Sequence, residues 1–349
     1  MTGRDEPRVS VVLPVRDGER WLAESIGSVL DQTFRDHELI VVDDGSTDAT
    51  PRIVAGFAAR DGRVQPVVLP RRLGLVAALE RGIAAARAPC IARHDADDVA
   101  RPERLARQVE LLESRPDVGV VGAAYHRLFD DGRLALRRPP AEDTEIRWRM
   151  LFGNVWPHPS VVFRRELLPP GEPVYRDVAL CEDYDLWLRL LDRSRGATVA
   201  EPLLVVRTHE SAGVSAPRRK AQARAVAELS AARIGRLLGE EVPPEAVEAM
   251  RRCRRATRLD PAAIREVPRL LRLWDALAGA PFVDRAEAAR LHRAWLRRLV
   301  GALPLGALPS LAGRGPLAEL RRREPGEVAR ALLTAWPRRR VARLAGSQS

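Results

Sequence analysis

The stretch ELIVVDDGS, residues 38–46, contains the clearest strand of the chain. Residues 39–42 are all apolar, as in a strand buried on both faces of a parallel sheet, and an Asp-Asp-Gly turn follows them. Similar apolar stretches, separated by segments with helical spacing, lie before and after it: Val9–Val15, Val64–Leu69, Pro89–Arg93 and Val118–Ala124. This alternation predicts an α/β fold with an open, doubly wound parallel sheet that binds ligands beyond the carboxyl ends of its strands.

The pattern changes twice along the rest of the chain. Residues 125–206 are mixed, with a hairpin expected at residues 130–132, strands at Ser160–Phe163 and Thr198–Val206, and a helix at Glu182–Leu191. After residue 215 the sequence is rich in Ala, Leu, Arg and Glu. The stretches with helical spacing there are Arg218–Leu238, Pro244–Arg258, Pro261–Ala278 and Arg285–Val300. We therefore expect two domains, residues 1–215 and a basic α-helical domain of residues 216–349.

Charge is divided between the same two regions. Residues 1–210 contain 30 Arg against 34 Asp and Glu, whereas residues 211–349 contain 28 Lys and Arg against 13 Asp and Glu. A basic second half suits an anionic membrane surface, and a solvated helical appendage or a dimer contact is the competing interpretation. Nothing resembles a nucleic-acid-binding motif, so no nucleic acid is expected. Three widely spaced cysteines and a charged N-terminus favour a cytoplasmic protein, with peripheral contact at the inner membrane face as an option.

Two acidic clusters directly follow predicted strands. They are Asp43-Asp44 and Asp95-Ala96-Asp97-Asp98. Because parallel strands end at one edge of a sheet, the clusters should meet in one crevice, where five carboxylates repel one another unless a cation compensates. Mg²⁺ or Mn²⁺ bridging carboxylates to a diphosphate would do so. Taken alone, each cluster would by default be a solvated turn, and it is their placement after two strands of one sheet that favours a site.

Several segments, taken in order, resemble family 2 glycosyltransferases of the GT-A fold. They are VVLPV (11–15), SVLDQT (28–33), ELIVVDDGSTD (38–48) and RHDADD (93–98), and a thinner likeness continues to about residue 215. The resemblance implies a Rossmann-like, mostly parallel sheet with helices on both faces, followed here by the helical C-terminal region. It also implies transfer of a sugar from a nucleotide-sugar donor, a UDP- or dTDP-sugar above others. The acceptor would be a glycan or a lipid-linked molecule of surface polysaccharide or lipid-linked glycan synthesis.

The resemblance further assigns roles to individual residues. The donor-binding set is Pro14, Val15, Asp43, Asp44, Arg93, Asp95, Asp97 and Arg207. The metal-binding set is Asp97, Asp98 and His209. In the segment CEDYDLWL, residues 181–188, Asp183 would be the general base of an inverting reaction. His158 and Glu182 are weaker candidates for acceptor contacts, because a structural turn and an acidic helix start explain them equally well.

Two other functions compete with sugar transfer. A sugar nucleotidyltransferase would also bind a nucleotide and a metal, but it usually has a Gly-rich loop after the first strand, where this chain has Arg16-Asp17-Gly18-Glu19-Arg20. A non-catalytic basic module that binds membrane or nucleic acid is the second alternative.

Two segments depart from the family pattern. They are Arg16-Asp17 and Arg71–Gly74, where the family often has Asn, so details of the donor contacts stay open.

Overall fold

The structure is a computed structural model that describes residues 6–176, 178, 180–208, 216–255, 259–303, 316–323, 325, 326 and 329. It divides the chain into two compact units. Unit 1 comprises residues 1–150 and 154–225, and unit 2 comprises residues 151–153 and 226–349. The predicted domain boundary after residue 215 stays a prediction.

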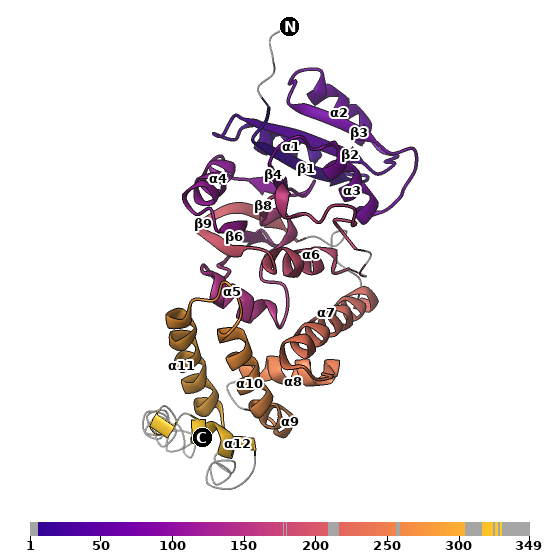
Figure 1. Cartoon of the computed structure of the whole chain (residues 1–349). Coiled ribbons are helices and arrows are strands. Elements are labelled where there is room, and N and C mark those ends of the chain that lie inside the picture. Colours follow the sequence, from indigo (N-terminus) through magenta and orange to yellow (C-terminus); the bar gives the residue numbers. More distant parts are fainter. Residues whose placement is uncertain are drawn as a thin grey trace, which may run out of the picture. The chain divides into compact units, whose positions relative to one another are not determined.

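Unit 1 is built on a nine-stranded sheet (Figure 1). Its strands are β1 (Val9–Val15), β2 (His37–Asp43), β3 (Val64–Val68), β4 (Cys90–Arg93), β5 (Val99–Ala100), β6 (Val118–Leu128), β7 (Leu134–Arg137), β8 (Val162–Arg164) and β9 (Arg195–Arg207). The spatial order is β3-β2-β1-β4-β8-β6-β9-β5, and β7 pairs with β6 in the expected hairpin. The first four strands are parallel, so β2, β1 and β4 end at the same edge.

The sheet is mixed rather than purely parallel. β8 is antiparallel to both β4 and β6, and β5 is antiparallel to β9. The expectation of uninterrupted parallel order from the fourth strand to Val118–Ala124 is therefore wrong, because β8 lies between β4 and β6. The broader expectation of a mostly parallel sheet is confirmed, since β6 and β9 run in the direction of β1–β4.

Helices cover both faces of this sheet. They are α1 (Leu22–Leu30), α2 (Thr50–Ala58), α3 (Leu75–Ala85), α4 (Arg104–Ser114), α5 (Asp143–Met150) and α6 (Glu182–Leu191). Odd-numbered residues of β1, such as Val11 and Leu13, share one apolar core with residues of α1, α2 and α4. The even-numbered Val12 faces α3, where a Cβ on Gly82 would lie 2.4 Å from Val12 Cγ1. The alternation of side chains along β1 thus places one layer of helices on each face.

The loops after β1 and β2 are joined by hydrogen bonds. Ser46 and Thr47 are residue types that often cap helices, but they do not cap α2, which begins at Thr50 and has Ala49 as its N-cap, without a side-chain cap bond. Instead the Ser46 hydroxyl accepts a hydrogen bond from the Asp17 amide at 2.9 Å, and the Thr47 amide donates to Asp17 Oδ1 at 2.8 Å. The residues therefore join two loops at the carboxyl edge of the sheet.

Unit 2 is helical, as predicted. The remaining helices are α7 (Ala216–Leu238, which begins in unit 1), α8 (Pro244–Arg255), α9 (Pro261–Arg265), α10 (Val267–Ala278), α11 (Arg285–Ala302) and α12 (Pro316–Arg323). The single helix expected at Pro261–Ala278 is two helices. Pro268 explains the break, because it has no amide hydrogen and its ring would clash with the carbonyl of the preceding turn. α10 contacts α8, α9, α11 and α12, and thus forms the centre of this unit.

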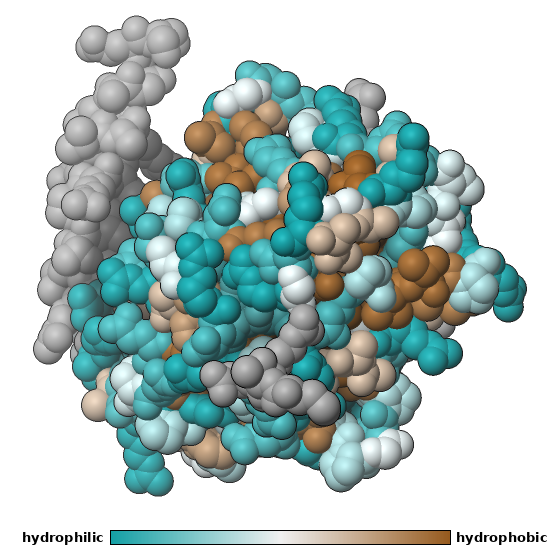
Figure 2. Space-filling model, turned by 90° about the horizontal axis from the view of Figure 1, so that it is seen from above, coloured by the Kyte–Doolittle hydropathy of each residue, from teal (hydrophilic) through white to brown (hydrophobic). Residues whose placement is uncertain are grey.

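The face of the molecule seen in Figure 2 is largely hydrophilic. Figure 2 shows teal residues over most of the face seen from above, with brown residues in small, separate groups. The large exposed apolar side chains among the described residues are Val68, Leu73, Leu75, Leu134 and Phe282. Within the described parts of the chain, the structure has no helix with the length and apolarity that a membrane span requires.

Candidate functional site

The turn after β2 positions Asp43 and Asp44 differently. Asp43 is 1% exposed; its Oδ1 accepts a hydrogen bond from the Ser46 amide at 2.9 Å, and its Oδ2 is buried without a partner in the described part of the chain. Both oxygens of Asp44 accept backbone hydrogen bonds from the loop after β3, from Leu73 at 2.6 Å and Gly74 at 2.9 Å. Asp44 therefore holds a loop, whereas Asp43 retains an oxygen that a ligand could use.

The loop after β1 connects this turn to the second acidic cluster. The Gly18 amide donates to the Thr50 hydroxyl at 2.8 Å, which attaches the loop to the β2 side. On its other side, a Cβ on Gly18 would lie 3.9 Å from the Cβ of Ala96. Pro14 and Val15 end β1 between these loops, with Val15 paired to Asp43 in register. The two acidic turns thus flank one loop at one edge of the sheet.

Asp95, Asp97 and Asp98 come together after β4. One carboxylate oxygen from each lies within 4.8 Å of the others. Burial raises the pKa of Asp98 well above its usual value, and the charges of Asp95 and Asp97 raise it further. Burial also raises the pKa of Asp95; Arg93 opposes this shift, and Asp97 adds to it. The cluster is a concentrated negative charge that a cation would stabilise.

These residues fit a divalent cation. Asp98 is 1% exposed and its Oδ2 has no hydrogen-bond partner among the described residues, so the atom is buried without the donor that a carboxylate normally requires. Carboxylate oxygens are the ligands that Mg²⁺ and Mn²⁺ prefer. His209, the third predicted ligand, lies outside the described residues.

Arg93 is a buried cation beside this cluster. It is 2% exposed, donates to Asp95 Oδ1 at 2.5 Å, and also bonds the carbonyl oxygen of His94. The packing beneath it is polar as well, since the buried Arg104 donates to the carbonyl oxygen of Arg93 at 2.7 Å and contacts His94 Nδ1 at 3.2 Å. Arg93 and Arg104 therefore hold the end of β4 in place from below.

Arg207 ends β9 against the same cluster. Its amide donates to Asp98 Oδ1 at 2.9 Å, and its guanidinium donates to the carbonyl oxygen of Asp97 at 2.7 Å and to Glu24 at 2.7 Å. The guanidinium carbon also lies 4.6 Å from the centroid of the Trp21 ring. These bonds show that Arg207 orders Asp97 and Asp98. The predicted contact of Arg207 with the donor stays a prediction.

Asp183 lies near the start of α6. The Asn154 side chain donates to its Oδ2 at 2.8 Å, and the Tyr184 amide donates to its Oδ1 at 2.7 Å. The amide of Trp156 donates to Asn154 Oδ1 at 3.1 Å, which fixes the side-chain amide with its NH₂ group toward Asp183. Burial raises the pKa of Asp183 to about 7, and the charge of Glu182 contributes to that increase. A carboxylate with this pKa is suited to proton transfer near neutral pH.

His158 lies in a short 3₁₀ turn, His158–Ser160. Its Nε2 is 2.9 Å from the Tyr175 hydroxyl, and its ring contacts the Trp187 ring edge-on. Burial lowers the pKa of His158 well below its usual value, and Arg93 lowers it further, so the ring is neutral. These contacts make His158 a packed, hydrogen-bonded side chain, and its contact with an acceptor stays a prediction.

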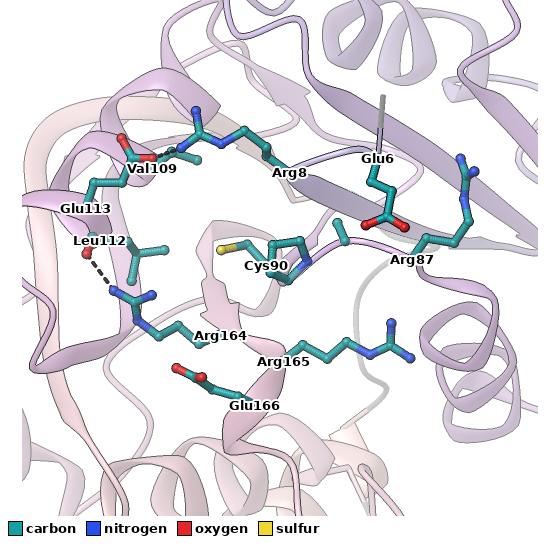
Figure 3. Close-up of a pocket in the computed structure, with 12 residues that line it drawn as sticks. Glu6, Arg8, Arg87, Cys90, Val109, Leu112, Glu113, Arg164, Arg165 and Glu166 are labelled. Carbon is teal, nitrogen blue, oxygen red and sulfur yellow. Dashed lines mark hydrogen bonds and ion pairs between the residues drawn. The ribbon is translucent and has the colours of Figure 1, made fainter. Parts of the chain in front are cut away.

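One surface cavity lies away from the acidic turns. It has a volume of about 610 Å³ and is lined by Arg8, Cys90, Glu113 and Arg164, among others (Figure 3). It lies where β4 begins and β8 ends, at the edge opposite Asp43 and Asp95. Arg8 pairs with Glu113, and Arg164 donates to the carbonyl oxygens of Val118 and Leu112, so these cations already have partners. The cavity is a poor candidate for the donor site.

Sequence reasoning missed Asn154 and Arg104. Asn154 is the only asparagine of the chain, which is the signal that could have marked it. Arg104 follows the acidic motif at the start of a helix, where a cation is electrostatically unfavourable unless something specific requires it.

Comparison with known proteins agrees with this geometry. The model of "Glycosyl transferase family 2" matches residues 10–168. A Bacillus subtilis protein named as glycosyltransferase EpsE is 34% identical over 212 residues, which cover 59% of this chain and 75% of that protein. The amylovoran biosynthesis glycosyltransferase AmsE of Erwinia amylovora is 32% identical over 171 residues, 49% of this chain and 64% of AmsE.

Solved structures share the fold at low identity. S. aureus TarS 1–349 in complex with UDP-GlcNAc is 17% identical, with a TM-score of 0.54 over 85% of this chain and 82% of that one. The mannosyltransferase PcManGT of Pyrobaculum calidifontis, in complex with GDP-Man and Mn²⁺, is 19% identical, with a TM-score of 0.51 over 95% of this chain and 88% of that one. The expected GT-A-like fold is confirmed. With strand-end acids, the fold and a relative of 34% identity in agreement, the chain belongs to glycosyl transferase family 2 and is a glycosyltransferase.

Proposed function

We propose that this glycosyltransferase moves a sugar from a nucleoside-diphosphate sugar to an acceptor hydroxyl with inversion at the anomeric carbon. The observation that carries the proposal is the convergence of Asp95, Asp97 and Asp98 in one cluster, with the unpartnered Asp43 oxygen at the same edge. Two proteins of the same fold were solved with UDP-GlcNAc and with GDP-Man and Mn²⁺, which supports a nucleotide-sugar donor. UDP- and dTDP-sugars are the donors proposed first.

Asp97 and Asp98 would hold Mg²⁺ or Mn²⁺, with His209 as a further ligand. When bound, the cation would neutralise charge on the diphosphate leaving group. Asp43 would accept a hydrogen bond from the nucleoside, beside the backbone of Pro14 and Val15. Arg93 and Arg207 would keep the acidic loop in place through their bonds to Asp95, Asp97 and Asp98.

Asp183 would be the general base. Asn154 and Tyr184 orient its carboxylate, and each oxygen keeps a lone pair that can take the acceptor proton. As the acceptor oxygen bonds to the anomeric carbon, its proton moves to Asp183 and the bond from that carbon to the diphosphate breaks. A general base is most effective when its pKa lies near the working pH, and a pKa of about 7 meets this condition at neutral pH.

The proposal is tested with a panel of UDP-, dTDP- and GDP-sugars and Mn²⁺. Thermal stabilisation identifies the donor, and NMR of the product determines the anomeric configuration. Asp183→Asn should abolish turnover and leave donor binding close to that of the wild type. Retention of configuration, or normal turnover by this variant, would reject the assignment.

A biosynthetic setting follows from the relatives. AmsE is named for amylovoran biosynthesis, and WbnJ of Escherichia coli, 28% identical over 206 residues, for O-antigen biosynthesis. We propose that the acceptor is a glycan or lipid-linked glycan of a surface polysaccharide. Incubation with a lipid-linked monosaccharide and with the free sugar would test the acceptor class.

A further inference from the structure

The outer face of α11 has an unusual composition. Every residue of this helix that is exposed is either arginine or alanine: Arg285, Ala286, Ala289, Arg290, Arg293, Ala294, Arg297 and Arg298. Its inner face is apolar and buried, with Trp295, Leu296 and Leu299 packed in unit 2. Arg290, Arg293 and Arg297 follow one another at spacings of three and four residues, which places them in one row along the helix.

In α8 and α10, the helices that α11 contacts, the arginines whose side chains the structure describes are paired with acids. Arg269 of α10 bonds Glu240 and Glu266, and Arg251 of α8 bonds Glu248. In contrast, Arg285, Arg290, Arg293 and Arg298 have no acidic partner among the described residues. The outer face of α11 therefore presents positive charge that no described acidic residue neutralises.

This arrangement opposes the stability of the helix. Like charges three or four residues apart repel each other. Asp284 at the N-cap and Glu287 in the first turn offset Arg285 at the positive end of the helix dipole, but α11 contains no acid after Glu287 to do the same for Arg290, Arg293 and Arg297. A solvated helix face usually alternates acids and bases. A row of arginines separated only by alanines is better explained by an external anionic surface that offers many phosphates.

We propose that the outer face of α11 docks the protein onto a lipid surface with anionic headgroups. Between the arginines this face has only alanine, so it offers no amide, hydroxyl or aromatic side chain that could read or stack on nucleic-acid bases. Phe282, three residues before α11, is 38% exposed and has a φ of 69°, an unfavourable backbone conformation for an aromatic residue. An exposed aromatic ring next to a basic helix is suited to the boundary between headgroups and acyl chains.

The proposal is tested by co-sedimentation of the full-length protein with phosphatidylcholine vesicles, with and without phosphatidylglycerol. We expect binding only to the anionic vesicles, and loss of that binding as salt shortens the range of the charges. Because each arginine near such a surface strengthens binding, the triple variant Arg290→Glu, Arg293→Glu, Arg298→Glu should bind at least about tenfold more weakly.

A matched control separates this face from net charge. Arg52, Arg81 and Arg138 are exposed in unit 1, and their triple change to Glu alters the net charge equally. This control variant should bind vesicles as the wild type does. Circular dichroism should show that both variants keep their helices, and a triple change of the α11 arginines to Gln should give an intermediate loss.

Phe282→Asn distinguishes a lipid surface from other polyanions. Asparagine accepts the left-handed backbone and removes the ring, so vesicle binding should weaken while binding to a duplex oligonucleotide does not change. Equal vesicle binding by the α11 and control variants would overturn the proposal. Tighter binding of wild type to the oligonucleotide than to anionic vesicles would also overturn it.

Discussion

Asp183 should make the activity depend on pH near neutrality. Burial and the charge of Glu182 raise its pKa to about 7, so below that pH the group is protonated and cannot take the acceptor proton. We expect the kcat/KM for the acceptor to fall by about tenfold per pH unit below the inflection and to level off above it. Initial rates from pH 5 to pH 9 at saturating donor measure this.

The variant Glu182→Gln tests whether Asp183, rather than another titrating group, causes the pH dependence of the activity. The variant removes a like charge, which lowers the pKa of Asp183, so the inflection should move to lower pH while the plateau stays similar. Glu166→Gln is a control for loss of one acidic charge elsewhere. An inflection that does not move in Glu182→Gln would assign the pH dependence to another group.

Asn154 should act on the rate through Asp183. Asn154→Ala removes a 2.8 Å hydrogen bond to the carboxylate, so we expect a loss of about tenfold in kcat and an inflection at higher pH. Asn154→Asp replaces the donor with a second negative group and should raise the inflection further. Donor affinity, measured by calorimetry, should be the same in both variants; a loss confined to donor affinity would contradict the role.

At the scale of single residues, the acids of the site could be predicted from the sequence, whereas the residues that hydrogen-bond to them could not. Asp43 and Asp95 could be located because acids that directly follow buried parallel strands must meet at one edge. The hydrogen bonds from the Leu73 and Gly74 amides to Asp44 could not be predicted, because they depend on the path of a loop 29 residues away. Asn154 was missed for the same reason.

Among the elements, α3 packs closely against the sheet at Gly82. A Cβ on Gly82 would lie 2.4 Å from Val12 Cγ1 and 3.1 Å from Val42 Cγ2, and valines in a buried strand have little freedom to move. Gly82→Ala should therefore lower the free energy of unfolding by about 1–3 kcal/mol. Thermal melting of the purified variant measures this.

Gly27 provides the matched control. It lies in α1, and a Cβ there would meet nothing within 4 Å, so Gly27→Ala should raise the free energy of unfolding by about 0.5–1 kcal/mol. If both variants had the same melting temperature, the close packing of α3 on β1 would be refuted.

The strands and helices were predictable where the periodic pattern is long. β1, β2 and α6 were expected within one residue of their observed ends, because apolar runs and helical spacing identify them directly. The placement of β8 between β4 and β6 was not, since a three-residue strand carries no information about its neighbours. The break at Pro268 was predictable from proline chemistry, but the apolar spacing on both sides concealed it.

At the scale of the whole molecule, charge and fold are divided in the same way. The acidic first part contains the sheet and every proposed donor ligand that the structure describes, and the basic second part contains the arginine face of α11. Chemistry and surface attachment would then belong to separate parts of one chain. Changes in α11 should therefore alter where the enzyme acts more than how fast it acts on a soluble acceptor.

Donor binding should protect the two units unequally. A ligand that binds only the folded state stabilises the unit that contains its site, by about 2.7 kcal/mol at a concentration 100 times its dissociation constant. Unit 2 has its own core around α10, so it need not open together with the sheet. With UDP and Mn²⁺ at that concentration, hydrogen exchange in β1, β2 and β4 should slow by up to about 100-fold, while α10 and α11 should not change. Asp98→Asn should remove most of the protection by weakening metal binding. Equal protection of α10 would show that the units unfold as one, and protection that survives Asp98→Asn would exclude Asp98 as a ligand.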